Sequence, residues 1–500
     1  MYQWKLSPNW LLSGLILLGI IPLYALPSSQ IPIIWFFLLV VDTLIILVIA
    51  DFYLRSSAFS LEFCFFIFVF QNILIGLFNP RGENLSYVAW LLGYSTLLPV
   101  FIILLNLFRG GGRKLSYFLP LHIISLLFTA YILFLFIISD APFEARIPAS
   151  RNAISIILLF YAGYLRPTFS KRDISSFDRF MLLLILAVVI FGYVELFIFD
   201  DYFWTERLNI DYVASAKNIN PTIQSSAPVP SDFYTPIAQR YYRRMASIFA
   251  TPITLGYFLA FAFLFILYAT ITIRRPPIKL MLKWIFLLAI LGALFLSLSK
   301  GGWQVLGVGI LFYIWLRKLP PKRFSHVLMI TLLLGAVSSM IGIGLFWGKG
   351  TTLELHVQGL LSPLTSLRGT TLLIGNSLGS GGTISARLGV DIPFSSERGA
   401  ENGIGTLLYQ TGFIGVLLVL MIMILILRYL FYNLRKLKSD IKTSTFLLIS
   451  LSATAGLVIN AFYQENSFAL IPASFFFITA GLALNRSLKP SGNQSGISEE

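Results

Sequence analysis

The sequence predicts an all-α polytopic membrane protein, and three observations support this fold class. Hydrophobic residues make up 57% of the 500 residues and charged residues only 12%. The mean hydropathy of +0.82 lies far outside the range of soluble domains. Apolar runs long enough to cross a bilayer recur along the chain, and Lys and Arg cluster in the short loops between them, as in multi-pass membrane proteins.

A hydrocarbon core about 30 Å thick needs roughly 20 apolar residues per helix. This rule predicts about fourteen spans, near residues 10–26, 31–54, 58–78, 86–108, 116–138, 151–167, 178–198, 252–273, 281–299, 301–317, 325–347, 402–428, 445–464 and 468–486. The first span resembles a signal peptide, because Lys5 precedes its apolar core. A second apolar run follows almost at once, so we expect a retained anchor.

The loops that follow the even-numbered spans all carry Lys or Arg. They contain Arg55, Arg109 to Lys114, Arg166 to Arg179, Arg274 to Lys283, Arg317 to Arg323, Arg428 to Lys442, and the tail after Asn485. Because positively charged loops are retained in the cytoplasm, we expect these loops and both termini on the cytoplasmic side.

This topology divides the chain into membrane and loop segments. We expect N-terminal transmembrane helices over 1–198, a first long outer loop over 199–251, central transmembrane helices over 252–347, a second long outer loop over 348–401, C-terminal transmembrane helices over 402–486 and a disordered tail over 487–500. The two long outer loops are expected to be the only segments with room for a polar site.

Charge and cysteine content argue against other classes of protein. The formal net charge of +15 could attract nucleic acid, but the cations lie in short loops between spans, so we expect no nucleic-acid partner. The single cysteine, Cys64, lies in an apolar run and supports neither a disulfide framework nor a cysteine metal cluster. The histidines His122, His326 and His356 are too widely spaced for a metal site. No metal and no cofactor are expected.

The second long loop ends with cations beside one acid. Arg387 and Arg398 precede Glu401, which lies at the mouth of an apolar helix that begins near Asn402. A carboxylate at a helix N-terminus can be a cap that complements the helix dipole. It can also be a general base within hydrogen-bond reach of an acceptor hydroxyl. Spacing alone leaves both interpretations open.

The first long loop places Arg240, Arg243 and Arg244 just before a span, where three- and four-residue spacing predicts a shared helical face. Guanidinium groups bind phosphate oxygens in a bidentate manner, so a diphosphate site is one interpretation. An anchor for lipid headgroups is the other. A functional role is favoured because Arg outside the cytoplasm runs against the positive-inside bias.

Lys300 lies between two apolar runs, with Gly301 and Gly302 directly after it. Ser297 and Ser299 add hydroxyl donors, so anion binding is favoured over a lysine that merely extends to the membrane interface.

The remaining candidates are weaker. Arg368 lies in the second outer loop, and His356 lies in a run whose periodicity predicts an amphipathic surface helix, where a lone His is more often structural. Carboxylates within spans are functional candidates by default. Asp42 and Glu62 are interpreted as paired across the bundle or lying near an interface. For Glu195, near the outer end of its span, a functional and a structural role both stay open.

Three segments together resemble the O-antigen ligase and polymerase superfamily of membrane glycosyltransferases. RMASIFATPITLGYFLA resembles the family's Arg, Pro and Gly at the start of a span, and LSLSKGGWQVLGVGI resembles its Ser-Arg-Gly segment. LIGNSLGSGG followed by ENGIGTLLYQTGFIGVL resembles its Gly-rich loop, His-Asn pair and Gly-x-x-Gly span. In this sequence Lys300 replaces the usual Arg, and Glu401 replaces the His that ligases use as a base, which favours a polymerase.

The resemblance implies a GT-C fold in the bacterial inner membrane, with the active site facing the periplasm. The implied reaction transfers a glycan from an undecaprenyl-diphosphate donor to a sugar hydroxyl of a lipid-linked repeat unit, without metal. Glu401 would be the base, and Arg243, Arg244, Lys300, Arg387 and Arg398 would hold the diphosphate, with Arg240, Arg368, Glu195, His356 and Asn402 as further candidates. The implied partners are this lipid-linked glycan, membrane lipids and a chain-length regulator that the long loops could bind.

Three other functions stay open at this point. One is ligation of finished polysaccharide to a final lipid or protein acceptor. Another is glycan polymerisation of the cell-wall shape-and-division type. The third is a flippase or transporter for lipid-linked oligosaccharide, although such proteins usually show internal repeats and a site near the midplane.

Overall fold

The computed structural model describes residues 59–78, 85–108, 111–166, 171–216, 219, 221–222, 224–237, 240–272, 277–318, 351–383, 402–437 and 441–488. The predicted spans at 10–26, 31–54 and 325–347 lie outside the described residues, as do Asp42, Arg387, Arg398, Glu401 and the tail from residue 489.

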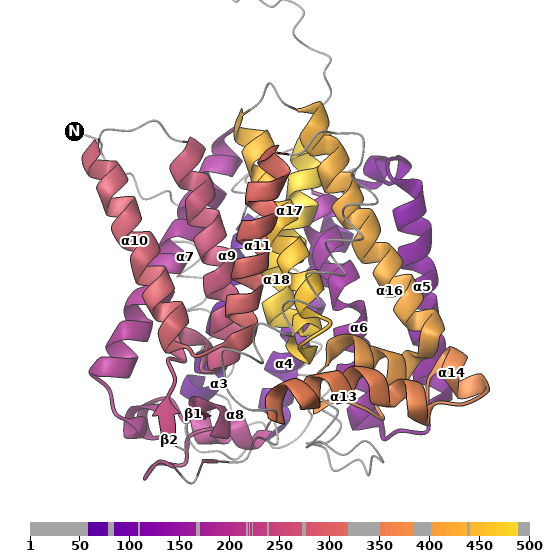
Figure 1. Cartoon of the computed structure of the whole chain (residues 1–500), viewed down its shortest axis with the longest axis horizontal. Coiled ribbons are helices and arrows are strands. Elements are labelled where there is room, and N and C mark those ends of the chain that lie inside the picture. Colours follow the sequence, from indigo (N-terminus) through magenta and orange to yellow (C-terminus); the bar gives the residue numbers. More distant parts are fainter. Residues whose placement is uncertain are drawn as a thin grey trace, which may run out of the picture.

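The described chain is a bundle of long helices that run back and forth along one axis (Figure 1). The long helices are α3 (Phe59–Phe78), α4 (Leu85–Phe108), α5 (Leu119–Ile138), α6 (Phe143–Tyr164), α7 (Lys171–Phe197), α9 (Pro252–Thr272), α10 (Pro277–Leu296), α11 (Lys300–Lys318), α16 (Gly403–Lys436), α17 (Ile441–Asn460) and α18 (Leu470–Ser487). Each coincides with one of the predicted spans, although α6 begins well before residue 151 and α16 runs beyond residue 428.

Helices α3, α5, α7, α16, α17 and α18 are the six in the described residues that are long and apolar enough to cross a membrane. Shorter apolar stretches lie at Ser95–Phe108, Pro252–Tyr268 and Met281–Leu296. These findings agree with the predicted class, a helical membrane protein.

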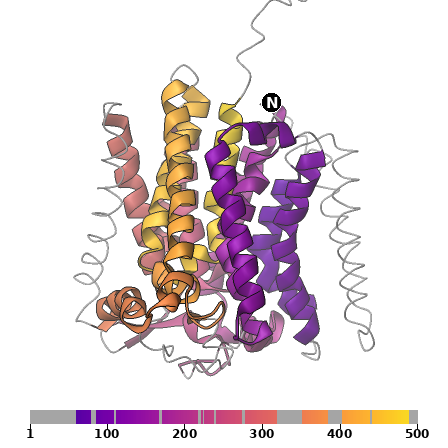
Figure 2. The same ribbon diagram turned by 90° about the vertical axis from the view of Figure 1, so that its right-hand side faces the viewer.

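Short elements gather at one end of the bundle, which we call the α13 end. They are α8 (Ile210–Ala216), α13 (Thr351–Ser366), α14 (Thr370–Ile374), the strands β1 (Tyr234–Ile237) and β2 (Arg240–Arg243), and the single-turn helices η2 (Phe203–Arg207), η3 (Ser231–Phe233), η4 (Ser247–Phe249) and η6 (Glu465–Phe468). Figure 2 shows α13 and α14, in orange, at this same end. The opposite end carries η1 (Gly111–Ser116) and the basic C-terminal turns of α16 and α18.

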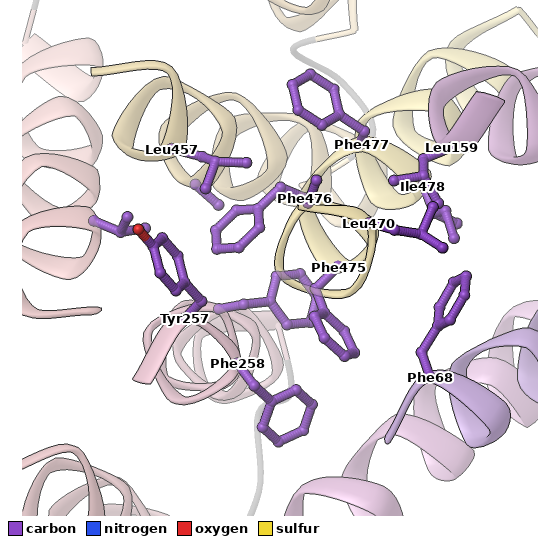
Figure 3. Packing of buried hydrophobic residues seen from close by; sticks show 14 of the residues in the cluster. Phe68, Leu159, Tyr257, Phe258, Leu457, Leu470, Phe475, Phe476, Phe477 and Ile478 are labelled. Atoms are coloured by element: carbon purple, nitrogen blue, oxygen red, sulfur yellow. The ribbon is translucent and has the colours of Figure 1, made fainter. Parts of the chain in front are cut away.

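Helix α18 is the centre of the core, because nearly every residue from Leu470 to Arg486 is buried. Phe475 stacks on Phe65 with ring centroids 5.4 Å apart and meets the Phe258 ring edge-on at 4.9 Å. Figure 3 shows Phe475 of α18 and Phe258 of α9 in the same group of buried side chains between the helices. Such ring geometry adds to the stabilisation from burial alone.

Glycines allow α18 to lie directly on α6. A Cβ atom on Gly163 would lie 2.2 Å from the Ile478 carbonyl oxygen, and one on Gly481 would lie 2.2 Å from the Phe160 carbonyl oxygen. Small residues at a helix crossing let backbones approach closely, which is a common way for membrane helices to associate. Backbone atoms cannot move aside as a flexible side chain can, so these positions require glycine.

The structure corrects one expectation for the α13 end. Arg240 and Arg243 do not share a helical face, because they lie at the two ends of strand β2, which pairs antiparallel with β1 in a two-stranded sheet. The aromatic pair Tyr241 and Tyr242 favours a strand over a helix. The described residues are otherwise mostly helical, in agreement with the predicted class.

The predicted amphipathic helix in the second long loop is present as α13 and lies across the bundle axis (Figure 1). One side of α13 contacts another helix, because a Cβ atom on Gly405 of α16 would lie 1.9 Å from the Gly359 carbonyl oxygen of α13. Helix α13 therefore packs directly on the first turn of α16.

We predict that Gly481→Ala lowers the thermal stability of the detergent-purified protein. The added methyl group would overlap the Phe160 carbonyl, and such overpacking typically costs about 1–3 kcal/mol. The control is Gly307→Ala on α11, whose added Cβ meets nothing within 4 Å and gains helix propensity. Thermal unfolding followed by size-exclusion fluorescence measures both variants. Equal melting temperatures would contradict the proposed helix contact.

Candidate functional site

Arg244 holds the turn that precedes Lys300. Its side chain is buried, and its Nε donates to the Ser297 carbonyl at 2.9 Å, its Nη1 to the Asp232 carbonyl at 3.2 Å and its Nη2 to the Leu298 carbonyl at 3.4 Å. Burial lowers the pKa of this guanidinium, and the nearby Asp232 carboxylate opposes that shift. A planar group with several fixed donors suits this arrangement, so Arg244 acts here as a clamp on backbone carbonyls.

Arg243, the neighbouring residue, forms ion pairs with two carboxylates. Its Nε lies 2.9 Å from Asp201 Oδ1 and its Nη2 lies 3.4 Å from Glu195 Oε2. Its Nη1 donates to the Phe199 carbonyl at 2.9 Å. Asp201 also accepts a hydrogen bond from Tyr234 Oη at 2.6 Å, and burial, then Asp201, raises the pKa of Tyr234 to about 12. The guanidinium of Arg243 therefore fastens the end of α7 to the hairpin.

Glu195, which the sequence left open, is fully buried and hydrogen-bonded by protein groups. Its Oε1 accepts from the backbone N–H groups of Ala246 at 2.7 Å and Ser247 at 3.1 Å. Its Oε2 accepts from Trp204 Nε1 at 3.2 Å. Glu62 is also buried and accepts from Ser176 Oγ at 2.9 Å, across from α3 to α7. These contacts give both carboxylates a structural role.

Lys300 is the first residue of α11 and is half-buried. The next residue, Gly301, lies against Gln464 of the connection between α17 and α18 and against Tyr257 of α9. A Cβ atom on Gly301 would be 2.2 Å from Gln464 Oε1 and 2.7 Å from Tyr257 Oη. Gly302 lies against α9, where a Cβ atom would be 2.6 Å from the Gly256 carbonyl oxygen. The first two segments of the family resemblance thus meet at the start of α11.

A buried network of amides and hydroxyls joins these helices. Tyr257 Oη donates to Asn460 Oδ1, and its distance to Gln464 Oε1 is 2.9 Å. Asn460 Nδ2 donates to Gln304 Oε1 at 2.6 Å, and Ser467 Oγ donates to Asn460 Oδ1 at 2.6 Å. Because buried polar groups are costly to leave unpaired, this network favours one arrangement of α9, α11 and the chain after α17.

The start of α16, which belongs to the third segment of the resemblance, packs on the same connection between α17 and α18. Asn402 is the N-cap of α16, and its Oδ1 accepts from the Gly405 N–H at 2.8 Å while its Nδ2 donates to the Phe462 carbonyl. The Ile404 N–H donates to the Ala461 carbonyl at 3.0 Å. A Cβ atom on Gly403 would lie 2.9 Å from the Gln464 carbonyl oxygen. The turn Ala461–Gln464 therefore lies between the starts of α11 and α16.

The Gly-rich loop covers the first turns of α16. The Asn376 N–H donates to the Tyr409 carbonyl at 2.8 Å, and Gln410 Nε2 donates to the Gly381 carbonyl. Gly412 interrupts α16 with a φ of 65°, where a Cβ atom would lie 2.2 Å from the Leu373 carbonyl oxygen. Positive φ and this close approach both require glycine.

A partly open cavity of about 40 Å³ lies between this loop, α6 and α16. Its lining comprises Ala145, Ala149, Asn152, Ala153, Gly381, Gly403, Thr406, Leu407, Gln410, Glu465 and Phe468. The Glu465 carboxylate is fixed in this wall, because its Oε2 accepts from the Thr383 N–H at 2.9 Å and from Thr383 Oγ1 at 2.6 Å. The cavity therefore holds a carboxylate whose neighbour in the chain, Gln464, reaches the start of α11.

The other sequence candidates lie elsewhere or outside the described residues. Arg240 and Arg368 are exposed, on β2 and between α13 and α14. His356 lies in α13. In the described ranges no three His, Cys, Asp or Glu side chains are grouped so as to hold a metal ion.

Sequence reasoning missed Glu465. It expected a polar site only in the two long loops, yet this carboxylate lies in the short connection between the predicted spans 445–464 and 468–486. The available signal was the polar run Gln464-Glu465-Asn466 between two apolar runs. Asn152 was missed for a related reason, because it was counted as part of the span 151–167.

No protein-family model matches the chain, and no significant match is found among curated proteins.

We predict that Arg244→Lys destabilises the protein although it preserves the charge. A lysine ammonium cannot reach the three carbonyls that Arg244 bridges, and buried carbonyls left unpaired cost roughly 1–3 kcal/mol each. The matched control is Arg240→Lys, at an exposed position four residues earlier. Thermal unfolding in detergent compares the two, and an Arg244→Lys melting temperature equal to that of the control would show that the clamp contributes nothing.

Proposed function

We propose that this protein is a membrane glycosyltransferase of the O-antigen ligase and polymerase type, with polymerisation as its reaction. It has about fourteen spans in the bacterial inner membrane and a GT-C fold. Its α13 end faces the periplasm and its termini face the cytoplasm. One observation carries the proposal: the three segments that resemble the family, far apart in sequence, converge on the turn Ala461–Gln464.

The proposed substrate is a glycan on undecaprenyl diphosphate. The hydroxyl oxygen of the acceptor sugar attacks the anomeric carbon of the donor, and the bond from that carbon to the diphosphate oxygen breaks. Glu401 takes the proton of the acceptor hydroxyl, and the diphosphate leaves with the electron pair of the broken bond. Lys300, with Arg387 and Arg398 from the second long loop, stabilises the charge that grows on the diphosphate.

The contacts at the first outer loop refine the roles of its arginines. Arg244 contributes by holding the turn before Lys300 rather than by binding oxygen atoms of the donor. The positive charge of Arg243 is paired with the carboxylates of Glu195 and Asp201. In the proposed reaction both are positioning residues, and Lys300 is the catalytic cation among the described residues.

Ligation to a final acceptor is the second candidate, since it would use the same donor and the same cations. The replacement of His by Glu at residue 401 favours polymerisation. The acceptor decides between the two reactions: a repeat unit still on its lipid carrier indicates a polymerase, and a final lipid or protein acceptor indicates a ligase.

We predict that purified protein elongates lipid-linked repeat units and that Lys300→Ala and Glu401→Gln each lower the rate by about a hundredfold or more, the usual effect of removing one group that stabilises transition-state charge. Lys300→Arg should retain most of the activity, because it keeps the cation. The control, Arg179→Ala, changes an exposed cation on α7. Gel electrophoresis and mass spectrometry of the glycans measure elongation and identify the acceptor.

Two outcomes would defeat this assignment. One is the absence of longer glycans with the wild-type protein. The other is elongation that survives both Lys300→Ala and Glu401→Gln. Movement of the unaltered lipid-linked oligosaccharide across vesicles, without elongation, would identify the flippase alternative instead.

A further inference from the structure

We infer that the cavity beside Glu465 is the subsite that binds hydroxyl groups of the acceptor sugar. The inference rests on the proposed function and gives it a second substrate contact, built entirely from described residues. Among the sequence candidates that the structure describes, none lines this cavity, although Gly403, the residue after Asn402, does.

The first argument is the unused hydrogen-bonding capacity of the lining. Asn152 Oδ1 accepts a long bond of 3.4 Å from Arg151 Nε, and the amide nitrogen of Asn152 has no partner among the described residues. The amide nitrogen of Gln410 donates to the Gly381 carbonyl, and the side-chain carbonyl oxygen of Gln410 has no partner among the described residues. The buried Thr406 hydroxyl is also unpaired there. A buried hydroxyl such as that of Thr406 is costly to leave unpaired unless a water or ligand satisfies it.

The second argument is the kind of ligand that this set of groups fits. An amide donor, an amide acceptor and a hydroxyl can each bond to a sugar hydroxyl, which both donates and accepts. The Glu465 carboxylate would repel a phosphate and attract a hydroxyl donor. The Phe468 ring supplies an apolar wall. A cavity of about 40 Å³ has room for a few water molecules, so it takes the hydroxyl-bearing edge of a sugar rather than a whole ring.

The third argument is position. Gly403, which lines the cavity, follows Glu401 by two residues, and Glu465 follows Gln464, whose amide lies against Gly301 beside Lys300. An acceptor sugar held in this cavity would lie beside the first turn of α16, which follows the proposed base in the sequence. The start of α11, which carries the proposed diphosphate cation Lys300, lies against Gln464. Glu465 would therefore be a catalytic-site residue that orients the acceptor, with Thr383 fixing its carboxylate.

The test uses full-length protein in detergent and the free oligosaccharide released by mild acid from the producing cell's lipid-linked repeat unit. This probe lacks the diphosphate, so it reports on sugar binding alone. Saturation-transfer NMR titration gives the dissociation constant. We expect Glu465→Gln to raise it about tenfold, because a bond to a charged acceptor is lost, and Thr406→Val to raise it about fivefold.

Thr406→Val separates binding from folding. The hydroxyl has no partner in the described residues, so its replacement by an isosteric methyl group should preserve or raise the melting temperature while it weakens sugar binding. Glu206→Gln, an exposed carboxylate on η2, is the control and should bind like the wild type.

Failure of the inference and failure of the proposed function give different results. If the wild type binds no oligosaccharide, or if Glu465→Gln and Thr406→Val bind as tightly as the wild type, the cavity holds only water and the inference is overturned even where elongation is intact. If binding depends on Glu465 but no elongation occurs, the sugar subsite stands and the transferase assignment fails.

Discussion

The buried side chain of Asn460 fixes the turn Ala461–Gln464, and the starts of α11 and α16 pack against that turn. Asn460 accepts from Tyr257 and Ser467 and donates to Gln304, so one side chain ties together α9, α11, α17 and η6. In a water-poor interior each of these bonds is strong, and the loss of any one leaves another group unpaired. The turn is therefore fixed by a polar network rather than by apolar packing, which has little directional preference.

Close backbone contact is the second constraint, and it acts on the same turn. Gly301, Gly302 and Gly403 each lie where a Cβ atom would overlap a neighbouring atom within 3 Å. Apolar side chains alone gain little by moving from lipid into a helix contact, so close van der Waals packing and polar bonds must provide specificity. The glycines bring α11 and α16 to within reach of one short turn, and this explains why three segments far apart in sequence share one neighbourhood.

The helices could be predicted from sequence because apolar run length is a direct consequence of bilayer thickness. The described helices occupy the predicted spans, and α13 was recognised from its periodicity. The conformation of Arg240 to Arg244 could not be predicted in the same way, because the three- and four-residue spacing of arginines is compatible with a helix or a strand. The pairing of β2 with β1 decides it, and that pairing is a tertiary contact.

The roles of charged side chains were harder still to predict. Arg243 and Arg244 are adjacent and look equivalent in the sequence, yet one forms ion pairs with Glu195 and Asp201 and the other binds carbonyls of a turn. Glu465 looked unremarkable because loop length was taken as a measure of the room for a site. Burial and partner identity set the function of an ionisable group, and neither is visible in local spacing.

The division of charge at this end of the bundle suits a transfer between two unlike substrates. A diphosphate leaving group needs cations, whereas an acceptor hydroxyl needs hydrogen-bond acceptors and a base. In this fold, Gln464 lies against the start of α11, and Glu465, the next residue, lines a separate cavity where Thr383 holds its carboxylate. The turn that ends at Gln464 thus links the start of α11 to this cavity, so the proposed cationic and carboxylate subsites are neighbours, as a direct transfer of a sugar between them requires.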